Sequence, residues 1–404
     1  MEYEKFFYFK DNAFGQKVYK NETGNEIIFS NNIIYIPKIQ NIYKNNSQIE
    51  DEKYTYSLDN LRVSEPCGLI NIKGVCYMNA VLQCFYYCPP LTDYFLNLKE
   101  YSINQLGLIS KGYYKFIKGI SSGNVKAAFS FKEAMIAADS SFIGSEGKDS
   151  KDVAILILSE IHEELKENDK SLLNAYQKVN YQDEVSVFEE KINLDKMNGN
   201  NTIISKTFEY FLLCEQKCKK CCQNRKGFFN IEADNILIFE MEYVYKKISK
   251  KKYNKYYPII SIEDCLDYYT SNEVIDCIKC KNHSLELTKK FCKLPKIFVF
   301  VLSRGLNANF NCTINFSPEI DLRKYYSPVK ELYREKSTEY NLICATFAYD
   351  WWKGTGHTVA FCKTYKSYGN NYQYYVFNDS STRKTSIEEI RGKTPYLLFY
   401  ERNK

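Results

Sequence analysis

The chain has 404 residues, 45% of them hydrophobic and 26% charged, which is the composition of a soluble globular protein with room for more than one lobe. Its net charge of +6 is modest and neither requires nor excludes a nucleic acid or a membrane surface as partner. The start of the chain is not leader-like, and no apolar run is long enough for a membrane span. An odd count of 15 cysteines, some in Cys-x-x-Cys pairs, argues against a secreted disulfide framework. We therefore expect a protein of the cytosol or the nucleus, without membrane contact.

Residues 1–60 combine short aromatic and β-branched runs, such as 26–30 and 32–37, with turns rich in asparagine and lysine. They contain no motif that points to a chemistry. We interpret them as an N-terminal extension of unknown role that packs on the rest of the protein. A separate targeting or adaptor element is the alternative.

A helix is predicted to begin at Cys76, because the apolar residues that follow it recur with helical spacing until Pro89 and Pro90. Glycines at 68 and 74 allow tight turns before it. At a helix N-terminus, free amides and the helix dipole favour a thiolate over a thiol, which would make Cys76 a nucleophile. A buried, unreactive cysteine remains the other interpretation at this point.

The segment around Cys76 resembles the cysteine box of the ubiquitin-specific proteases. The matching residues are Gly68, Leu69, Asn71, Gly74, Cys76, Tyr77, Met78, Asn79, Leu82, Gln83 and Cys84. The resemblance implies that Cys76 attacks the carbonyl at the C-terminus of ubiquitin and that Asn71 helps to stabilise the oxyanion. It extends over roughly 61–402.

The same resemblance implies an α+β, papain-like cysteine protease fold. Its parts would be a helical thumb at about 61–180, zinc-ribbon β fingers at about 200–292, and a β-sheet palm. The palm would comprise about 181–199 and 293–404, so that 61–404 form one catalytic domain.

Helical periodicity also predicts helices at 91–99, 109–120, 131–138 and 148–166. Near the start of the last one, Asp149 and Asp152 have two interpretations. Carboxylates there cap the helix and complement its dipole, and they are also suited to charge-assisted bonds with guanidinium groups. The segment resembles a second box of the family, which implies that Asp149 and Asp152 hold the arginines of the ubiquitin tail.

Two Cys-x-x-Cys pairs, Cys218 with Cys221 and Cys277 with Cys280, have the spacing of zinc knuckles. Together they predict one structural, tetrahedral Zn²⁺ ion, and the residues between the pairs would run out and back as strands. Cys214, Cys222 and His283 are spare ligands, and a set of reduced thiols without metal is the alternative.

Between the two knuckles, residues 245–257 form a basic run with interleaved tyrosines. Such a run could contact nucleic acid. We favour a solvated loop or strand end, so no nucleic-acid partner is expected.

The C-terminal part is predicted to be β structure, starting with a buried strand at 294–304. His357 stands at the start of a strand, and the next strand, 372–377, ends at Asn378. If these strands form a hairpin, His357 and Asn378 are cross-strand neighbours and can share a hydrogen bond. A cysteine nucleophile needs such a base, and the family's histidine box matches here. Asp379 is then a candidate for assisting the oxyanion or polarising water.

The sequence thus predicts a deubiquitinating cysteine protease with a triad of Cys76, His357 and Asn378. Its partners would be ubiquitin, ubiquitinated proteins and a regulatory protein complex. Two alternatives stay open: a protease for another ubiquitin-like modifier, and a non-catalytic ubiquitin-binding scaffold.

Overall fold

The computed structural model divides into two compact units, one of Met1–Asn45 with Asp169–Lys178 and one of Asn46–Asn168 with Val179–Lys404. The residues it describes are 6–11, 17–21, 26–29, 66–72, 74–143, 149–166, 183–221, 227–249, 259–277, 280–305, 310, 312–349, 356–365, 372–390 and 393–404. Most of the predicted extension, most of the basic run and the spare ligand Cys222 lie outside these residues. Among the described helices, none is both long and apolar enough to cross a bilayer.

In the first unit, the described backbone forms a three-stranded antiparallel sheet. Its strands follow the order of the chain, β1 (Phe6–Asp11), β2 (Lys17–Asn21) and β3 (Glu26–Phe29). This sheet is the described part of the predicted extension.

The second unit begins with helices that correspond to the predicted thumb. They are α1 (Cys76–Tyr86), α2 (Pro89–Leu96), α3 (Glu100–Gln105), α4 (Leu108–Ser121), α5 (Ala128–Ala138), the short 3₁₀ helix η2 (Ser140–Phe142) and α6 (Ser150–Glu164). Two more follow, α7 (Glu184–Met197) and α8 (Ile203–Phe208). The helix that starts at Cys76 is confirmed, and it ends before the two prolines. Those prolines open α2 instead, because a proline lacks only an amide that is unbonded in a first turn.

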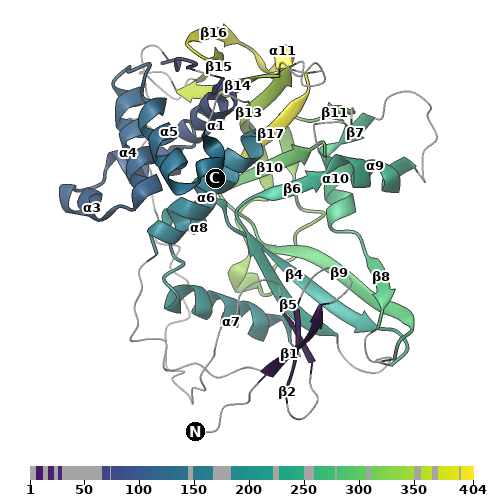
Figure 1. Cartoon of the computed structure of the whole chain (residues 1–404). Helices are drawn as coiled ribbons and strands as arrows, with labels where there is room; N and C mark the ends of the chain where they lie inside the picture. The colour runs from purple at the N-terminus through teal and green to yellow at the C-terminus, as the bar shows by residue number, and fades with distance from the viewer. Residues whose placement is uncertain are drawn as a thin grey trace. The chain divides into compact units, whose positions relative to one another are not determined.

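An eight-stranded sheet lies next to these helices (Figure 1). Seven strands form a path in the order β16-β15-β14-β13-β17-β10-β6, and β12 pairs with β13. The strands are β6 (Leu237–Glu240), β10 (Ile297–Ser303), β12 (Glu319–Asp321), β13 (Glu339–Tyr349), β14 (His357–Tyr365), β15 (Tyr372–Asn378), β16 (Ser381–Thr385) and β17 (Pro395–Arg402). Every residue of β10 is buried, as the continuous apolar run predicted.

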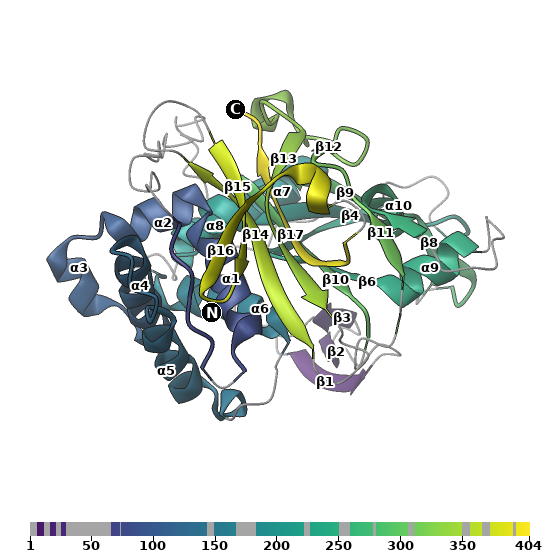
Figure 2. The ribbon, with the colours of Figure 1, turned by 90° about the horizontal axis from the view of Figure 1, so that it is seen from above.

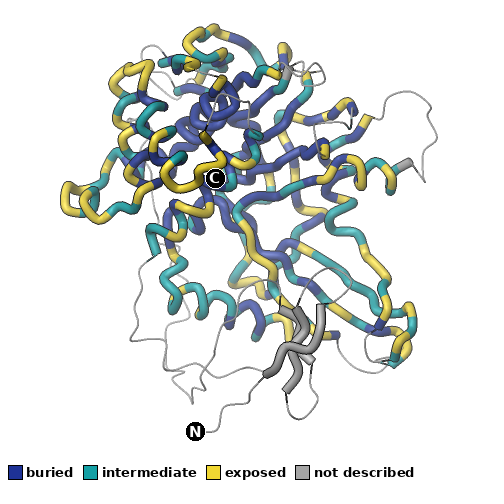
Figure 3. The backbone as a smooth tube through the Cα atoms, viewed as in Figure 1, coloured by how far each residue is buried: buried dark blue, intermediate teal, exposed yellow. Residues whose placement is uncertain are grey.

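The two faces of this sheet belong to different cores. Helix α1 packs along β14 and also contacts β13 and β15 (Figure 2), so one face forms a core with the thumb helices. Residues such as Phe361 and Tyr400 project from the other face into a second core. Strands buried on both sides appear as the dark blue centre of Figure 3.

The predicted fingers form a separate four-stranded antiparallel sheet in the order β5-β4-β9-β8. Its strands are β4 (Tyr210–Cys218), β5 (Phe228–Asp234), β8 (Glu273–Asp276) and β9 (His283–Lys293). Strand β9 is exposed or half-buried at its start and buried at Phe291 and Cys292, where it approaches the rest of the unit. The remaining elements are α9 (Met241–Ser249), β7 (Ile259–Ser261), α10 (Ile262–Tyr269), β11 (Thr313–Asn315), η5 (Glu331–Tyr333) and α11 (Ile387–Ile390).

Candidate active site and thiol cluster

Cys76 is the first residue of α1, and the loop before it is shaped to place it there. Gly74 adopts a positive φ of 73°, a conformation that favours glycine. The backbone N–H of Val75, at the helix N-cap, donates to Oδ1 of Asn71 over 2.8 Å. One of the unpaired amides of the helix start is thus bonded by Asn71 rather than by water.

The Cys76 side chain is mostly buried, with the residue 7% exposed. Burial is the main cause that raises the pKa of its thiol, and the negative charge of Asp379 raises that pKa further. A hydrogen bond from the backbone of Thr358 opposes this effect. Burial thus counteracts the effect of the helix start, which was expected to favour the thiolate. The sulfur nevertheless contacts the residue that directly follows His357.

His357 opens β14 and Asn378 closes β15, and their side chains are joined by a 2.6 Å contact from Nε2 to Oδ1. The predicted hydrogen bond is present. The predicted register is wrong by two positions, since Ala360 pairs with Phe377, so the two residues are diagonal rather than directly opposite. An acceptor oxygen at Nε2 keeps that nitrogen protonated. In the neutral ring, Nδ1 then carries the lone pair and can act as a base.

Asp379 lies in the two-residue turn between β15 and β16, with a positive φ of 50°. Its carboxylate accepts a hydrogen bond from Nδ2 of Asn71 and another from Nδ2 of Asn79, each 2.9 Å long. It also lies 4.0 Å from Nε2 of His357. Gly68 packs directly against the turn, where a Cβ would meet backbone oxygens at 2.5–2.7 Å. The turn, the loop before Cys76 and the imidazole are therefore fixed against one another.

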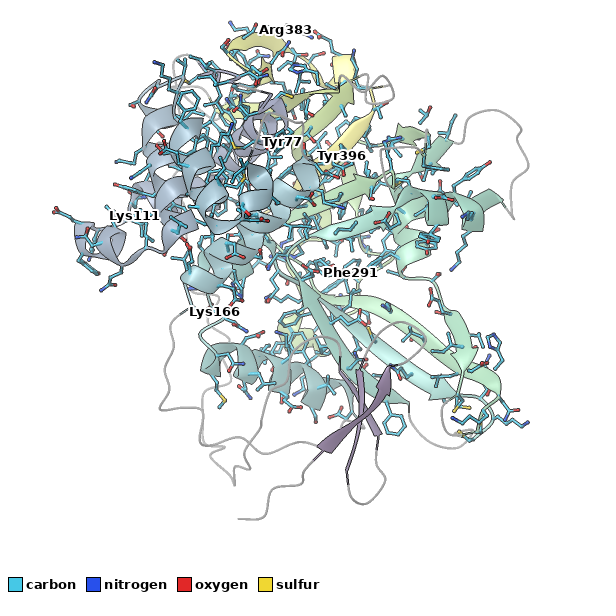
Figure 4. The ribbon with its side chains drawn as sticks, in the orientation of Figure 1. Tyr77, Lys111, Lys166, Phe291, Arg383 and Tyr396 are labelled. Carbon is cyan, nitrogen blue, oxygen red and sulfur yellow. The ribbon has the colours of Figure 1, made fainter. Side chains whose placement is uncertain are left out.

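The two acidic residues of α6 differ in their surroundings. Asp149 is the N-cap residue, and its Oδ1 accepts the backbone N–H of Lys151 over 2.8 Å. Its Oδ2 accepts a hydrogen bond from the Tyr396 hydroxyl over 2.6 Å, which connects α6 with β17. Tyr396 is labelled in Figure 4. Asp152, in the first helical turn, is exposed. The capping interpretation of Asp149 is confirmed, and its role toward a substrate stays a prediction.

The four predicted ligand cysteines converge at the outer end of the fingers. Their sulfur atoms lie within 4.8 Å of one another, with 3.6 Å between Cys218 and Cys280 and 3.7 Å between Cys221 and Cys277. Four sulfurs at 2.3 Å from a tetrahedral zinc ion lie about 3.8 Å apart. The spacing of this four-cysteine cluster therefore fits a bound zinc ion.

Hydrogen bonds from the backbone N–H of Cys221 and from Ser284 lower the pKa of Cys218 to about 5. They favour the thiolate that metal ligation requires. The spare ligand His283 is exposed and bonded to Asp276 over 2.9 Å, and Cys214 is buried within β4. Neither belongs to the cluster. A second group of three thiols, Cys84, Cys344 and Cys362, is wholly buried between α1 and the sheet.

Sequence reasoning missed the roles of Asn79 and Tyr396, which hold Asp379 and Asp149. Asn79 lies in α1, four residues before Gln83. The Asn79 amide donates to the Asp379 carboxylate, and the Gln83 amide donates to the backbone oxygen of Cys67. A buried amide on an otherwise apolar helix face was the available signal, because such a group needs a partner.

The chain is similar in fold and in sequence to known proteins. Two solved structures of the SAGA Ubp8/Sgf11/Sus1/Sgf73 DUB module resemble this chain. The module bound to ubiquitin aldehyde has a TM-score of 0.59 and 20% identity, over 87% of this chain and 72% of that chain. A second structure of the module has a TM-score of 0.56 and 21% identity, over 86% of this chain and 70% of that chain. The fold is thus the papain-like α+β fold with thumb, palm and fingers.

The family model described as ubiquitin carboxyl-terminal hydrolase matches residues 67–400. Ubiquitin carboxyl-terminal hydrolase 16 of Arabidopsis thaliana is 25% identical over 368 residues, which cover 86% of this chain and 31% of the relative. Ubiquitin carboxyl-terminal hydrolase 2 of Homo sapiens is 24% identical over 358 residues, covering 83% and 54%. The chain thus spans 31% and 54% of the lengths of these two relatives. It belongs to the ubiquitin carboxyl-terminal hydrolase family.

Proposed function

We propose that this protein is a deubiquitinating cysteine protease, which hydrolyses the isopeptide or peptide bond after the C-terminal glycine of ubiquitin. One observation carries the proposal. The Cys76 sulfur accepts a hydrogen bond from the backbone of Thr358, the residue after His357, and His357 is paired with Asn378 in a chain of this family. Nucleophilic catalysis by cysteine uses an imidazole that a third group orients, and we assign these roles to Cys76, His357 and Asn378.

The proposed reaction uses these residues in the following order. Nδ1 of His357 takes the thiol proton, and Sγ of Cys76 attacks the glycine carbonyl carbon. The Asn71 amide carries two hydrogens, of which Asp379 accepts one. The other hydrogen, with the backbone N–H of Cys76, donates to the oxyanion.

The imidazolium then protonates the leaving amine while the C–N bond breaks and a thioester remains. Water, deprotonated by His357, attacks that thioester, the C–S bond breaks, and the proton returns to the sulfur. Asn378 keeps the ring in the required tautomer throughout, because its carbonyl accepts the Nε2 proton.

The acidic start of α6 is proposed to bind the arginines of the ubiquitin tail. Asp152 is exposed in the first turn of α6, where the helix dipole stabilises a negative charge. The negative charge of Asp149 would add to the attraction for these arginines. Its carboxylate would still cap the helix and accept the hydrogen bond from the Tyr396 hydroxyl.

The four-cysteine cluster is proposed to hold one structural zinc ion through Cys218, Cys221, Cys277 and Cys280. The sulfur–sulfur distances described above support this assignment. Bound zinc would tie the end of β4 to the segment between β8 and β9. It would stiffen the fingers and take no part in the chemistry at Cys76.

Ubiquitin and ubiquitinated proteins are the proposed partners, and a regulatory complex is a further one, since the similar Ubp8 structures are of a multi-protein module. Cytosol or nucleus is the proposed location. The described cysteines form no disulfide, which suits a reducing compartment.

The proposal is tested by turnover of a ubiquitin conjugate with the wild type and with Cys76→Ala. We expect hydrolysis by the wild type, no measurable hydrolysis by the variant, and ubiquitin binding by both. Full activity of Cys76→Ala would exclude the proposed mechanism. A protein that binds ubiquitin but never cleaves a conjugate would be the scaffold alternative.

A further inference from the structure

A cavity of about 350 Å³ adjoins the histidine–asparagine pair, on the palm side of the candidate active site. It is lined by His357, Val359, Val376, Asn378, Ser381 and Arg383. Its volume is in the range of sites that hold a small ligand or a few side chains. We name it the palm pocket.

The palm pocket is built by one face of three neighbouring strands. In the register of the sheet, Val376 pairs with Phe361 on β14 and with Arg383 on β16, and Asn378 pairs with Ser381. Because side chains alternate across a strand, the pocket residues all lie on the same face. The opposite face carries Ala360 and Phe377, which pack with the thumb helices. The pocket is therefore separated from α1 by the thickness of the sheet, and it meets the proposed catalytic residues at His357 and Asn378.

The position beside His357 is where a leaving group must lie. The imidazolium delivers a proton to the departing lysine amine, so that nitrogen comes within hydrogen-bond distance of the ring. Residues next to this lysine in the target protein are then within reach of the palm pocket. On the other side of the scissile bond lies the ubiquitin tail, whose arginines are proposed to bind the acidic start of α6 and not the palm pocket.

The charge of the palm pocket indicates what it accepts. Of its six lining residues, Arg383 alone has a permanent charge, and none is acidic. The Arg383 side chain is 59% exposed and bonded to Glu389 over 2.7 Å. Glu389 also interacts with the positive charge of Lys393. A guanidinium has five N–H donors and can bind a second carboxylate.

We propose that the palm pocket binds the target protein on the leaving-group side of the scissile bond. Its Arg383 selects an acidic residue next to the ubiquitinated lysine. Val359 and Val376 form an apolar floor for the methylene groups of that residue. This inference rests on the proposed deubiquitinase function and adds a preference among its targets.

The test uses ubiquitin joined through its C-terminal glycine to the lysine of a short peptide. Three peptides carry glutamate, glutamine or lysine on both sides of that lysine, and kcat/KM is measured for each with the full chain. We expect the wild type to prefer the glutamate peptide over the glutamine peptide by about three- to fivefold, the effect of one solvent-exposed ion pair. Arg383→Gln should bring this ratio close to unity, and Arg383→Glu should reverse it in favour of the lysine peptide.

Lys384→Glu is the matched control, because Lys384 is exposed on the same strand but on the opposite face from Arg383. It makes the same change of charge sign and should keep the wild-type order of peptides. Equal rates for the three conjugates, or the same shift in Lys384→Glu as in Arg383→Glu, would overturn the assignment of the palm pocket while leaving the protease function intact. If the wild type cleaved none of the conjugates, the proposed function would fail as well.

Discussion

Two amides converge on the carboxylate of Asp379, and this contact determines how Asn71 is presented to the substrate. One Asn71 hydrogen is bonded to Asp379, and the Asn71 carbonyl is bonded to the helix start at Val75. With both ends of the amide bonded, its remaining hydrogen has a fixed direction. A preorganised donor of this kind stabilises a transition state more than a mobile one.

A double-mutant cycle tests whether Asp379 acts through Asn71. We expect Asn71→Ala to lower kcat by about 100-fold, the usual effect of removing one oxyanion donor. Asp379→Ala should lower kcat by a similar factor, because Asn71 then loses its support. The double variant should be little worse than either single one, since both changes remove the same interaction. Fully multiplicative losses in the steady-state kinetics would show that the two residues act independently.

The ionisation of Cys76 gives a second test at this scale. Its thiol pKa is raised, first by burial and then by the charge of Asp379. Removing a negative charge favours the thiolate, so Asp379→Asn should move the pH midpoint of iodoacetamide alkylation at Cys76 to a lower pH. The midpoint is followed by mass spectrometry, with Asp321→Asn on β12 as the control. A midpoint that stays in place or rises in Asp379→Asn would contradict the electrostatic account.

Among the elements, α4 is held by a residue of another helix. The Glu164 carboxylate at the end of α6 accepts the backbone N–H groups of Ile109 and Ser110 over 2.9 and 2.7 Å. These are amides of the first turn of α4, which have no partner within their own helix. Gly107 makes room for this carboxylate, because a Cβ there would meet the Glu164 side chain at 2.3–2.6 Å.

Removing this cap should therefore destabilise the thumb. We expect Glu164→Ala to lower the free energy of unfolding by about 1–2 kcal/mol, as the loss of a helix N-cap does. The neighbouring substitution Glu163→Ala removes an ion pair with Lys166. Because the Glu163 side chain is 61% exposed, this loss should change the free energy of unfolding very little. Denaturant unfolding followed by circular dichroism compares the two variants. Equal stability for both would mean that the cap contributes nothing.

The fingers give a prediction about metal content. Wild-type protein should contain one zinc ion per chain by elemental mass spectrometry. Cys280→Ser should lose it, since one of four thiolate ligands is gone. Cys214→Ala removes a buried cysteine of β4 outside the four-cysteine cluster and should retain the metal. A wild type without zinc, or a Cys280→Ser variant that keeps it, would refute the assignment.

At the scale of the whole molecule, the features that the sequence predicted are those with strong local signals. The helix at Cys76, the buried strand β10 and the cysteine pairs of the fingers each depend on short-range spacing. The hydrogen bond between His357 and Asn378 was also predictable, because one hairpin connects them.

The remaining features depend on contacts between distant segments. Asn71 and Asp379 are 308 positions apart, and Glu164 and Ile109 are 55 apart. Such pairs leave no periodic trace in the sequence. The raised pKa of Cys76 was missed for the same reason, since it results from burial and from Asp379, which tertiary packing brings to the helix start. The register between β14 and β15 differs by two positions from a direct pairing of His357 with Asn378, because the sequence does not fix the residue at which the hairpin turns.

The measurement that tests the central claim most directly is the reaction of the full chain with a ubiquitin probe that has a vinyl electrophile at its C-terminus. The labelled residue is then mapped by mass spectrometry, and probes with the tails of other ubiquitin-like modifiers are run in parallel. We predict one ubiquitin attached per chain, at Cys76, and much slower labelling by the other probes. Attachment at another cysteine, or no attachment by any probe, would contradict the account of Cys76 as the nucleophile. Faster labelling of Cys76 by the probe of a different modifier would mean that this modifier, and not ubiquitin, is the substrate. The assignment of Cys76 as the nucleophile would still hold.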